Sequence, residues 1–535
     1  MSFSRWKLSS SRLSIVNISL CLLLGMTLFY LFILQVQAIW PFTIDDMYIT
    51  LRYAKHWVEG YGLVWNVSEP PVEGYSNFSF VLLGRLALIL GYDPVGLLKS
   101  AGIIGLFFTC LAVFAIARMW FVTSLAVIPC LWLLAYKGQI LWSVSGLETA
   151  VYQALICSAV FFIFRGLGNS FISKADLASL PKVVSDDSIR PSSFLIAGIL
   201  LALAGLTRPE SPALMGLFAL LLLINKPRSP CPRYWQSVVL FCATILFCFA
   251  PYFLWRWHYY GRFFPNPVYC KGLINPMSFT LDKAYLYLVW PFALLVIPAL
   301  WQGKDPRYHF LWLPSVLYLV LLMGADPIVA FDNRLFLPAF VLLLPLVLQG
   351  LHILCTRYVQ HVWCYNLLIY FVGFVVAFFF IPMMTLADYR HFTENPLAGE
   401  RLRQQVISWL KSNTPMGSRV VLSDSGLIPY NSRYQFIDSY CLNNAAMTVR
   451  PLSTMYQRLC EEVLETKPAV IILTGLIEDG TVTYTPADAC LAIQLLHSKD
   501  YCMQASLGTG DVHSFYRYEI FSKSNKSCSK MQQGR

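Results

Sequence analysis

Two adjacent carboxylates, Asp45 and Asp46, stand directly after a long apolar run and begin a segment rich in tyrosine, tryptophan and glycine. Ionisable side chains at a membrane boundary are costly unless they bind a partner or take part in chemistry. Successive helical residues point about 100° apart, so the two aspartates are expected to do different jobs. We predict that both are catalytic: one deprotonates an acceptor hydroxyl, and the other holds a metal ion or a structural arginine.

A simpler alternative is that this pair caps a helix. Thr43 and Asp46 fit a capping box, and acidic side chains stabilise a helix N-terminus. The continuation of the segment favours a site, because residues seven positions beyond the aspartates return to the same helix face. We therefore predict that substrate is bound by polar and aromatic residues of this segment, namely Arg52, Tyr53, Trp65, Glu73, Tyr75 and Asn77. An aromatic belt at the membrane interface would explain some of these residues equally well.

Composition indicates which elements must position these side chains. The chain has 535 residues, of which 57% are hydrophobic and 13% charged, and its mean hydropathy is +0.57. Soluble domains carry about 25% charged residues. Apolar runs long enough to cross a bilayer recur between residues 15 and 386, and the first is too long for a signal peptide. The sequence predicts a polytopic α-helical membrane protein.

The positions of lysine and arginine orient the apolar runs. All the basic loops fall in the cytoplasm if spans lie near residues 15–39, 97–117, 120–136, 149–164, 193–206, 211–224, 236–255, 283–300, 310–323, 335–354 and 363–386. This arrangement has about eleven helices, with the N-terminus inside and the C-terminus outside. One broken helix around residues 207–210 would invert everything downstream, so we prefer two helices there.

The segment 77–91 is predicted to lie in the outer interface rather than to span. It is short, and Arg85 interrupts it. Counting it as a span would place the basic loop 165–190 outside. The first external loop therefore covers residues 40–96 of the membrane domain, which we place at residues 1–386.

The remaining tail, residues 387–535, is predicted to be an extracytoplasmic soluble α/β domain. Residues 402–410 alternate as an amphipathic helix, and residues 419–423 and 469–473 are short β-rich runs of the kind buried in a parallel sheet. If the tail is exported, its cysteines can form disulfides, although their pairing stays open: Cys441, Cys460, Cys490, Cys502 and Cys528.

Charge and cysteine spacing exclude several classes of function. The net charge of +11 does not indicate nucleic-acid binding, because the basic residues sit in short loops between apolar runs. The fifteen cysteines show no CxxC pair and no Cys/His ligand spacing, so zinc and redox chemistry have little support. We predict no certain cofactor, and we leave a divalent metal ion open as a hypothesis.

On this topology the other unusual polar residues fall outside. Carboxylates bind sugar hydroxyls, so Glu148, Glu210 and Asp326, together with Arg208, are candidate substrate ligands, although Arg208 can instead pair with the glutamates. Arg262, Lys271 and Arg334 are cations on the face where the orientation rule disfavours them. A donor phosphate would supply the missing anion. Anionic lipid headgroups are the alternative for the 256–271 loop, and a salt bridge with Asp332 is the alternative for Arg334.

These residues resemble a known family, the GT-C glycosyltransferases, and are closest to the mycobacterial terminal arabinofuranosyltransferases. The segments that carry the resemblance occur in order along most of the chain: Asp45-Asp46-Met-Tyr-Ile-Thr-Leu-Arg52-Tyr53, Gly60-Tyr-Gly-Leu-Val-Trp65-Asn66, Val72-Glu73-Gly-Tyr75-Ser-Asn77, Trp142 to Thr149, Thr207-Arg208-Pro-Glu210, Tyr260 to Asn266, Gly324-Ala-Asp326, Asn333-Arg334, Asp424-Ser-Gly426 and Phe436-Ile-Asp438. The chain departs from the family where Ser211 follows Arg-Pro-Glu in place of the usual glycine, and around Asp326 and Asp332.

The resemblance implies a membrane-bound transferase that uses a polyprenyl-phosphate sugar, with the aspartates of the first loop at its active centre. The expected function is transfer of a sugar, for instance a pentofuranose such as arabinofuranose, to a cell-envelope glycan or a lipid-linked acceptor outside the bacterial cytoplasmic (inner) membrane. The main alternative is a transporter or flippase of lipid-linked sugars, which would predict polar residues at mid-membrane depth and internal repeats. A non-catalytic polymer-binding protein is a weaker alternative.

Overall fold

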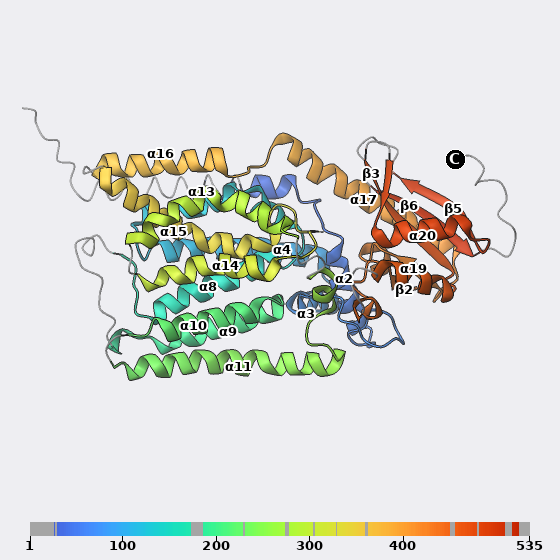
Figure 1. Cartoon of the computed structure of the whole chain (residues 1–535), viewed down its shortest axis with the longest axis horizontal. Helices are drawn as coiled ribbons and strands as arrows, with labels where there is room; N and C mark the ends of the chain where they lie inside the picture. The colour runs from blue at the N-terminus through green and yellow to red at the C-terminus, as the bar shows by residue number, and fades with distance from the viewer. Residues whose placement is uncertain are drawn as a thin grey trace, which may run out of the picture.

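A computed structural model of the chain describes residues 26, 29–30, 32–172, 186–227, 230–272, 278–302, 305–327, 329–358, 362–449, 455–478, 481–508 and 516–523. The predicted first span, residues 15–39, therefore lies mostly outside the described residues. Figure 1 shows a bundle of long helices that lie along the long axis of the molecule, with a sheet-containing region at one end of the bundle.

The apolar runs form the bundle. Its helices are α4 (Pro94–Ala117), α5 (Thr123–Ala126), α6 (Ile128–Ala135), α7 (Lys137–Val144), α8 (Thr149–Gly166), α9 (Pro191–Thr207), α10 (Ser211–Ile224), α11 (Pro232–Tyr260), α13 (Thr280–Gln302), α14 (His309–Leu322), α15 (Leu337–Tyr358) and α16 (Val362–Phe380). Several begin with a proline in the first turn, where its missing N–H costs no hydrogen bond. A helix occupies each predicted span after the first.

The length and hydropathy of these helices identify a polytopic membrane protein. Within the described residues, five helical segments are long and apolar enough to span on their own: α4, α8, α11, α13 and the segment Arg334–Thr356 that includes α15. The bent pair formed by Thr123–Ala135 and α7, with an angle of 69°, would make a sixth. Helices α9 and α10 are shorter, so the count of about eleven spans stays a prediction.

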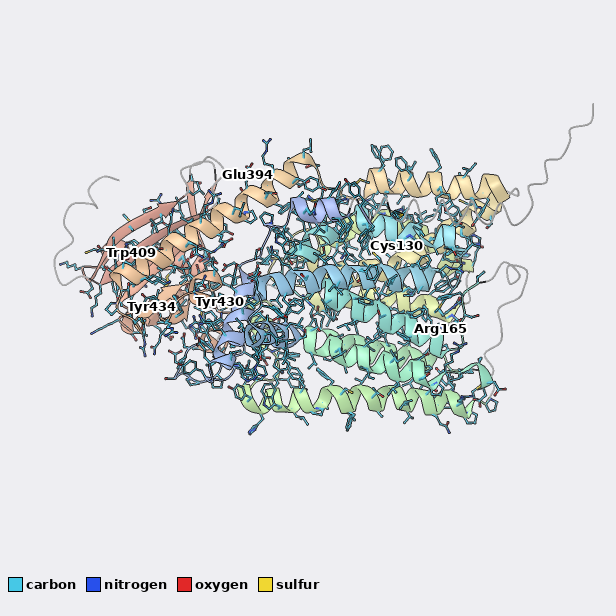
Figure 2. All side chains as sticks on the ribbon, turned by 180° about the vertical axis from the view of Figure 1, so that it is seen from behind. Cys130, Arg165, Glu394, Trp409, Tyr430 and Tyr434 are labelled. Atoms are coloured by element: carbon cyan, nitrogen blue, oxygen red, sulfur yellow. A yellow bond between two sulfur atoms is a disulfide. The ribbon has the colours of Figure 1, made fainter. Side chains whose placement is uncertain are left out.

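The polar loops gather at one end of the bundle and the basic loops at the other. Helix α8 begins next to Glu148 and ends near Arg165, which Figure 2 shows far from the sheet. Phe218 of α10 stacks on Phe310 at the start of α14, with ring centroids 5.8 Å apart, and Phe310 also meets Phe164 near the end of α8. Helix α10 therefore returns to the basic end, and the turn at residues 207–210 joins two antiparallel helices rather than breaking one.

Helices α2 (Asp46–Val58) and α3 (Phe78–Leu90) pack together at the end of the bundle that faces the sheet. The chain enters and leaves α3 at this same end. Asn77, before α3, donates to Glu148 at 2.9 Å, and Lys99, in the first turns of the following α4, donates to the Trp40 carbonyl at 2.5 Å. This is the geometry expected of a helix that does not span.

The C-terminal region contains one mixed sheet. Its elements are α17 (Leu386–Asn413), β1 (Arg419–Leu422), α18 (Leu427–Tyr430), β2 (Gln435–Asp438), α19 (Met455–Glu465), β3 (Val470–Glu478), β4 (Thr481–Tyr484), α20 (Pro486–His497), β5 (Tyr501–Gly508) and β6 (Tyr516–Lys523). The strand order is β2-β1-β3-β6-β5, with β4 paired to β3. The two predicted strands are β1 and β3, which are parallel neighbours as their apolar sequences indicate.

The sheet meets the loop of residues 40–96 at a contact that we call the junction. It is formed by Asp45, Arg52 and Trp65 of this first loop with residues 424–436 and Arg403 of the C-terminal region. Figure 2 places Tyr430 and Tyr434 at this contact. The carboxyl end of β1 leads into it, and the carboxyl end of its parallel neighbour β2 leads into residues 439–449. Ligands of open α/β sheets commonly bind outside the carboxyl ends of parallel strands.

Candidate active site

A cavity of about 330 Å³ opens at the end of the bundle that faces the sheet. Its polar lining includes nine of the fifteen predicted site residues: Asp46, Tyr75, Asn77, Glu148, Arg208, Glu210, Lys271, Asp326 and Arg334. Its apolar lining includes Phe264, Val268, Leu321, Leu322 and Val329. Side chains as far apart in the sequence as Asp46 and Leu442 thus share one space.

Asp46 is the carboxylate that faces the cavity from α2. Its side chain is 30% exposed, and its Oδ2 lies 3.6 Å from the Nζ of Lys271. Among the described residues the alternative capping box does not form, because Asp45, the residue at the N-cap, makes no side-chain cap hydrogen bond and Thr43 donates to the Pro41 carbonyl. Asp46 is therefore a carboxylate at a cavity wall with a cation beside it.

Glu148 is the centre of a buried ion cluster that also lines the cavity. It is 2% exposed and accepts hydrogen bonds from Arg208 Nη1 at 2.8 Å, Arg334 Nη2 at 3.1 Å and Asn77 Nδ2 at 2.9 Å. Arg208 also donates to Glu210 at 2.5 Å. Burial by itself would raise the pKa of Glu148, but the two guanidinium groups outweigh it and hold that pKa below its usual range. The structure therefore shows the ion pair with Arg208 that was the alternative to sugar binding by this glutamate.

Lys271 ends α12 (Asn266–Lys271), a helix of six residues at the rim of the cavity. Its Nζ lies 3.6 Å from Asp46 Oδ2. Arg208 and Arg334 lie closer to Glu148, at 2.8 Å and 3.1 Å. Its backbone carbonyl accepts from the N–H of Asp326 at 2.8 Å, and Asp326 Oδ2 accepts from Tyr440 Oη at 2.7 Å. Lys271 can therefore bind an incoming anion with a smaller loss of existing contacts than Arg208 or Arg334.

Asp45 points away from the cavity into the junction. Its Oδ1 accepts from the Leu427 N–H at 3.0 Å and from Arg403 Nε at 3.2 Å, and Arg403 also binds Asp424 at 2.8 Å. Burial raises the pKa of Asp45 well above its usual value, against the opposing effect of Arg403. A Cβ on Gly426 would lie 2.0 Å from Asp45 Oδ2, so only glycine fits there. Asp45 holds a structural arginine, and we no longer assign it to catalysis.

Arg52 and Trp65 were predicted to bind substrate, but their polar atoms are committed to the protein. Arg52 is 3% exposed and donates to the carbonyls of Trp65 at 2.9 Å, Tyr434 at 3.3 Å and Pro429. Trp65 Nε1 donates to the Phe436 carbonyl at 3.3 Å. Because β2 is an edge strand, the bond from Trp65 covers a Phe436 carbonyl that would otherwise be exposed. Both residues lie in the junction instead of the cavity, and we correct their role to a structural one.

Tyr53, Glu73 and Arg262 also lie outside the lining of the cavity as its described residues define it. Tyr53 Oη donates to the Val72 carbonyl at 2.6 Å, and Glu73 forms a buried ion pair with Arg256 at 2.6 Å. Arg262 donates to the Ala445 carbonyl at 2.8 Å. These contacts support the loops around the site. We therefore correct the predicted role of the three residues from substrate or phosphate binding to a structural one.

Sequence reasoning missed the contributions of Leu442, which lines the cavity, and of Tyr440, which binds Asp326. Both come from the C-terminal region, and the Tyr440–Asp326 bond joins residues 114 positions apart. The only signal nearby was the Phe436-Ile-Asp438 segment of the family resemblance.

The described residues do not gather three or more His, Cys, Asp or Glu side chains at a potential metal site. The charged neighbour of Asp46 within the cavity is a lysine. A cation beside a carboxylate disfavours a divalent metal ion there. We therefore assign no step to a metal.

The fold of the chain is similar to that of two solved structures. ArnT from Cupriavidus metallidurans, solved with bound undecaprenyl phosphate, superposes with a TM-score of 0.56 at 11% identity, covering 97% of this chain and 99% of that one. The Archaeoglobus fulgidus oligosaccharyltransferase gives a TM-score of 0.55 at 11% identity, covering 87% and 76%. The predicted GT-C fold is confirmed by these similarities.

Two further comparisons are more distant or more local. The mycobacterial arabinofuranosyltransferase AftD gives a TM-score of 0.47 at 12% identity, over 94% of this chain and 42% of that one. Residues 389–521 match the model of a domain of unknown function, DUF8728. No curated protein matches the sequence.

Proposed function

We propose that this protein is a glycosyltransferase that moves a sugar from a polyprenyl-phosphate donor to a hydroxyl of a glycan or lipid-linked acceptor. The observation that carries the proposal is the cavity itself, where the carboxylate of Asp46 stands 3.6 Å from the ammonium of Lys271 beside an apolar wall. A lipid phosphate needs a cation and an apolar surface in one place. Similar structures were solved with undecaprenyl phosphate and with dolichol-phosphate bound.

We assign the parts of the donor to the walls of the cavity by their chemistry. The prenyl chain takes the apolar side around Phe264, Val268 and Leu321. The phosphate takes Lys271, with Arg334 as the second cation. The sugar then lies toward Asn77 and the Glu148 cluster.

The reaction follows from these positions. The acceptor hydroxyl attacks the anomeric carbon, its proton passes to Asp46, and the bond between the anomeric carbon and the phosphate oxygen breaks. The phosphate leaves with the bonding electrons and gains negative charge, which Lys271 and Arg334 stabilise. Asp46 receives one proton per turnover and returns it to water.

Two observations support an extracytoplasmic site. Cys270 pairs with Cys441 and Cys460 with Cys490, and disulfides persist in oxidising compartments. The basic ends of the helices lie opposite the cavity, as the positive-inside rule requires of cytoplasmic loops. We therefore place the cavity and residues 387–535 outside the bacterial cytoplasmic membrane.

The family resemblance of the first loop makes a pentofuranose, such as arabinofuranose, the first donor sugar to test.

The test is transfer by the purified protein in lipid nanodiscs, supplied with a panel of radiolabelled polyprenyl-phosphate pentoses and hexoses and with cell-envelope glycans. We expect label to move from one donor to an acceptor, and to stay on the donor with the Asp46→Asn variant. Absence of transfer from every donor would contradict the proposal. Movement of intact lipid-linked sugar across a vesicle membrane, without transfer, would instead support a transporter.

A further inference from the structure

One wall of the cavity comes from the C-terminal region, from a segment that we call the clamp loop, residues 438–449. Leu442 of this loop lines the cavity, and Tyr440 donates to Asp326 at 2.7 Å. The ring centroid of Tyr440 also lies 5.7 Å from Lys271 Nζ. The clamp loop therefore touches the cation that the proposed function assigns to the donor phosphate.

The clamp loop is held in one shape by its first residue. Asp438 is buried, and its carboxylate accepts from the N–H groups of Tyr440 at 2.8 Å, Cys441 at 3.2 Å and Asn443 at 2.8 Å. Cys441 has a φ of 96°, a left-handed backbone conformation that is unfavourable for residues other than glycine. Such a conformation persists only where the surrounding contacts fix it.

Helix α12 is fastened to the clamp loop along its length. Asn266, at its start, donates from Nδ2 to the carbonyls of Cys441 at 2.8 Å and Leu442 at 2.9 Å. Cys270, near its end, forms the disulfide with Cys441. Lys271 follows Cys270 directly, so the covalent link lies one residue from the cavity cation.

These attachments matter because α12 is too short to be stable alone. Isolated helices below about 12–15 residues are marginal in water, and α12 has six. The clamp loop, together with the Asp326 contact, therefore holds the helix that carries Lys271.

We propose that the Cys270–Cys441 disulfide, together with Asn266, is a positioning device that keeps Lys271 at the donor phosphate. The inference rests on the proposed function and adds to it that the C-terminal region controls donor affinity. Cys270 and Cys441 are 1% and 0% exposed, so the bond is sealed from reductants and acts as a permanent brace.

The second disulfide provides a matched control. Cys460 and Cys490 join α19 to α20 within the C-terminal region, and neither residue lines the cavity among the described residues. Replacing either cysteine pair with alanines removes one disulfide. Only the Cys270–Cys441 disulfide is attached to the helix that ends at Lys271.

The experiment compares the variants C270A/C441A and C460A/C490A with the wild-type protein in nanodiscs. It measures the KM for the donor, kcat, and direct binding of radiolabelled polyprenyl phosphate that carries no sugar. We expect C270A/C441A to weaken phosphate binding and to raise the donor KM by about 10- to 100-fold, the scale of a displacement near 1 Å in a site. The acceptor KM and the C460A/C490A variant should stay at wild-type values. Equal donor KM in the two double variants would overturn the inference.

A coupling measurement separates positioning from general destabilisation. If the disulfide acts through Lys271, adding K271M to C270A/C441A should weaken donor binding no further than K271M alone. Additive losses would contradict the inference.

If C270A/C441A does not fold, the variant Asn266→Ala, which keeps the disulfide, replaces it. Asn266→Ala must then weaken donor binding and leave acceptor binding unchanged. Normal donor binding by that variant would overturn the inference. A wild-type protein that binds polyprenyl phosphate but transfers nothing would contradict the proposed function and leave this inference standing.

Discussion

The cavity and the junction draw charged residues from the same loop, yet they use them in opposite ways. In the cavity, Asp46 is partly exposed and its cation stands off at 3.6 Å. In the junction, Arg52 is sealed among backbone carbonyls and Asp45 among N–H and guanidinium donors. Charges with solvent access and loosely held partners can exchange those partners for a substrate. Charges that are fully hydrogen-bonded inside the protein hold its parts together.

The two adjacent aspartates show how sharply the regions divide. A rotation of about 100° between successive helical residues is enough to send Asp46 into the cavity and Asp45 into the sheet. A motif of polar residues around a family active site is thus not a list of substrate contacts. In this protein, part of the motif builds the site and part joins the sheet to the membrane helices.

The largest expected effect comes from the cavity aspartate. Asp46→Asn should lower kcat by about 10²–10⁴-fold, because the amide cannot accept the acceptor proton. Its thermal unfolding midpoint should fall only slightly, since Asp46 lies in the first turn of α2, where a negative charge contributes about 0.3–1 kcal/mol. The measurement is the transfer rate and unfolding of the same purified sample.

Asp45→Asn is the matched junction variant. It should lower stability by weakening the contact with Arg403, while transfer per folded molecule is retained. Loss of turnover in Asp45→Asn with normal turnover in Asp46→Asn would reverse the roles assigned to the two aspartates.

The next largest effect distinguishes a cavity lysine from a junction lysine. Lys271→Met should raise the donor KM by about 10- to 100-fold, the loss expected for a hydrogen bond to a charged group of about 1.5–3 kcal/mol. Lys55→Met removes a cation that donates to the Tyr430 carbonyl at 3.2 Å in the junction, and it should leave the donor KM unchanged. Donor titrations of both variants decide the matter, and an equal response would remove the distinction between the two regions.

Replacing the junction arginine should affect folding and spare chemistry. Arg52→Met leaves several buried carbonyls without a donor, at a cost of about 1–3 kcal/mol for each unsatisfied group. We expect a lower thermal unfolding midpoint with unchanged donor and acceptor KM for the folded fraction. A stable Arg52→Met protein with a raised KM would restore the substrate contact predicted from the sequence.

The smallest effect concerns a buried carboxyl of α20 that binds the sheet and lines no part of the cavity among the described residues. Asp488 accepts from Ser423 Oγ at 2.6 Å and from the Thr474 N–H at 3.0 Å, and burial raises its pKa to about 6. Because the folded state holds this proton more tightly than the unfolded state, its contribution to stability is complete below about pH 4. That contribution falls by about 1 kcal/mol per pH unit as the pH rises to about 6.

Hydrogen exchange of β1 and β3 in the full-length protein, measured from pH 4 to pH 7, tests this sign. Asp488→Asn keeps the shape of the side chain and cannot ionise, so it should flatten the profile without changing transfer. A wild-type profile in which protection increases over the same range would show that the carboxyl is ionised in the fold.

The sequence was sufficient for the helices of the bundle and for two of the strands. Apolar runs and basic loops predicted the helices from residue 97 onward, because hydrophobic length and charge asymmetry are local properties of the chain. Strands β1 and β3 were recognisable from continuous apolar residues for the same reason. The family resemblance brought together Asp46, Glu148, Arg208 and Arg334, the charge rule added Lys271, and all five line the cavity.

The division of those residues between cavity and junction depended on the tertiary structure. Whether a carboxylate faces a space or a guanidinium is fixed by what packs against it, and Arg403 lies more than 350 residues from Asp45. Tyr440 and the Cys270–Cys441 bond reach the cavity from a sheet that folds back onto the first loop. Such contacts leave no periodicity or spacing in the sequence, because they arise only when two separately folded surfaces meet.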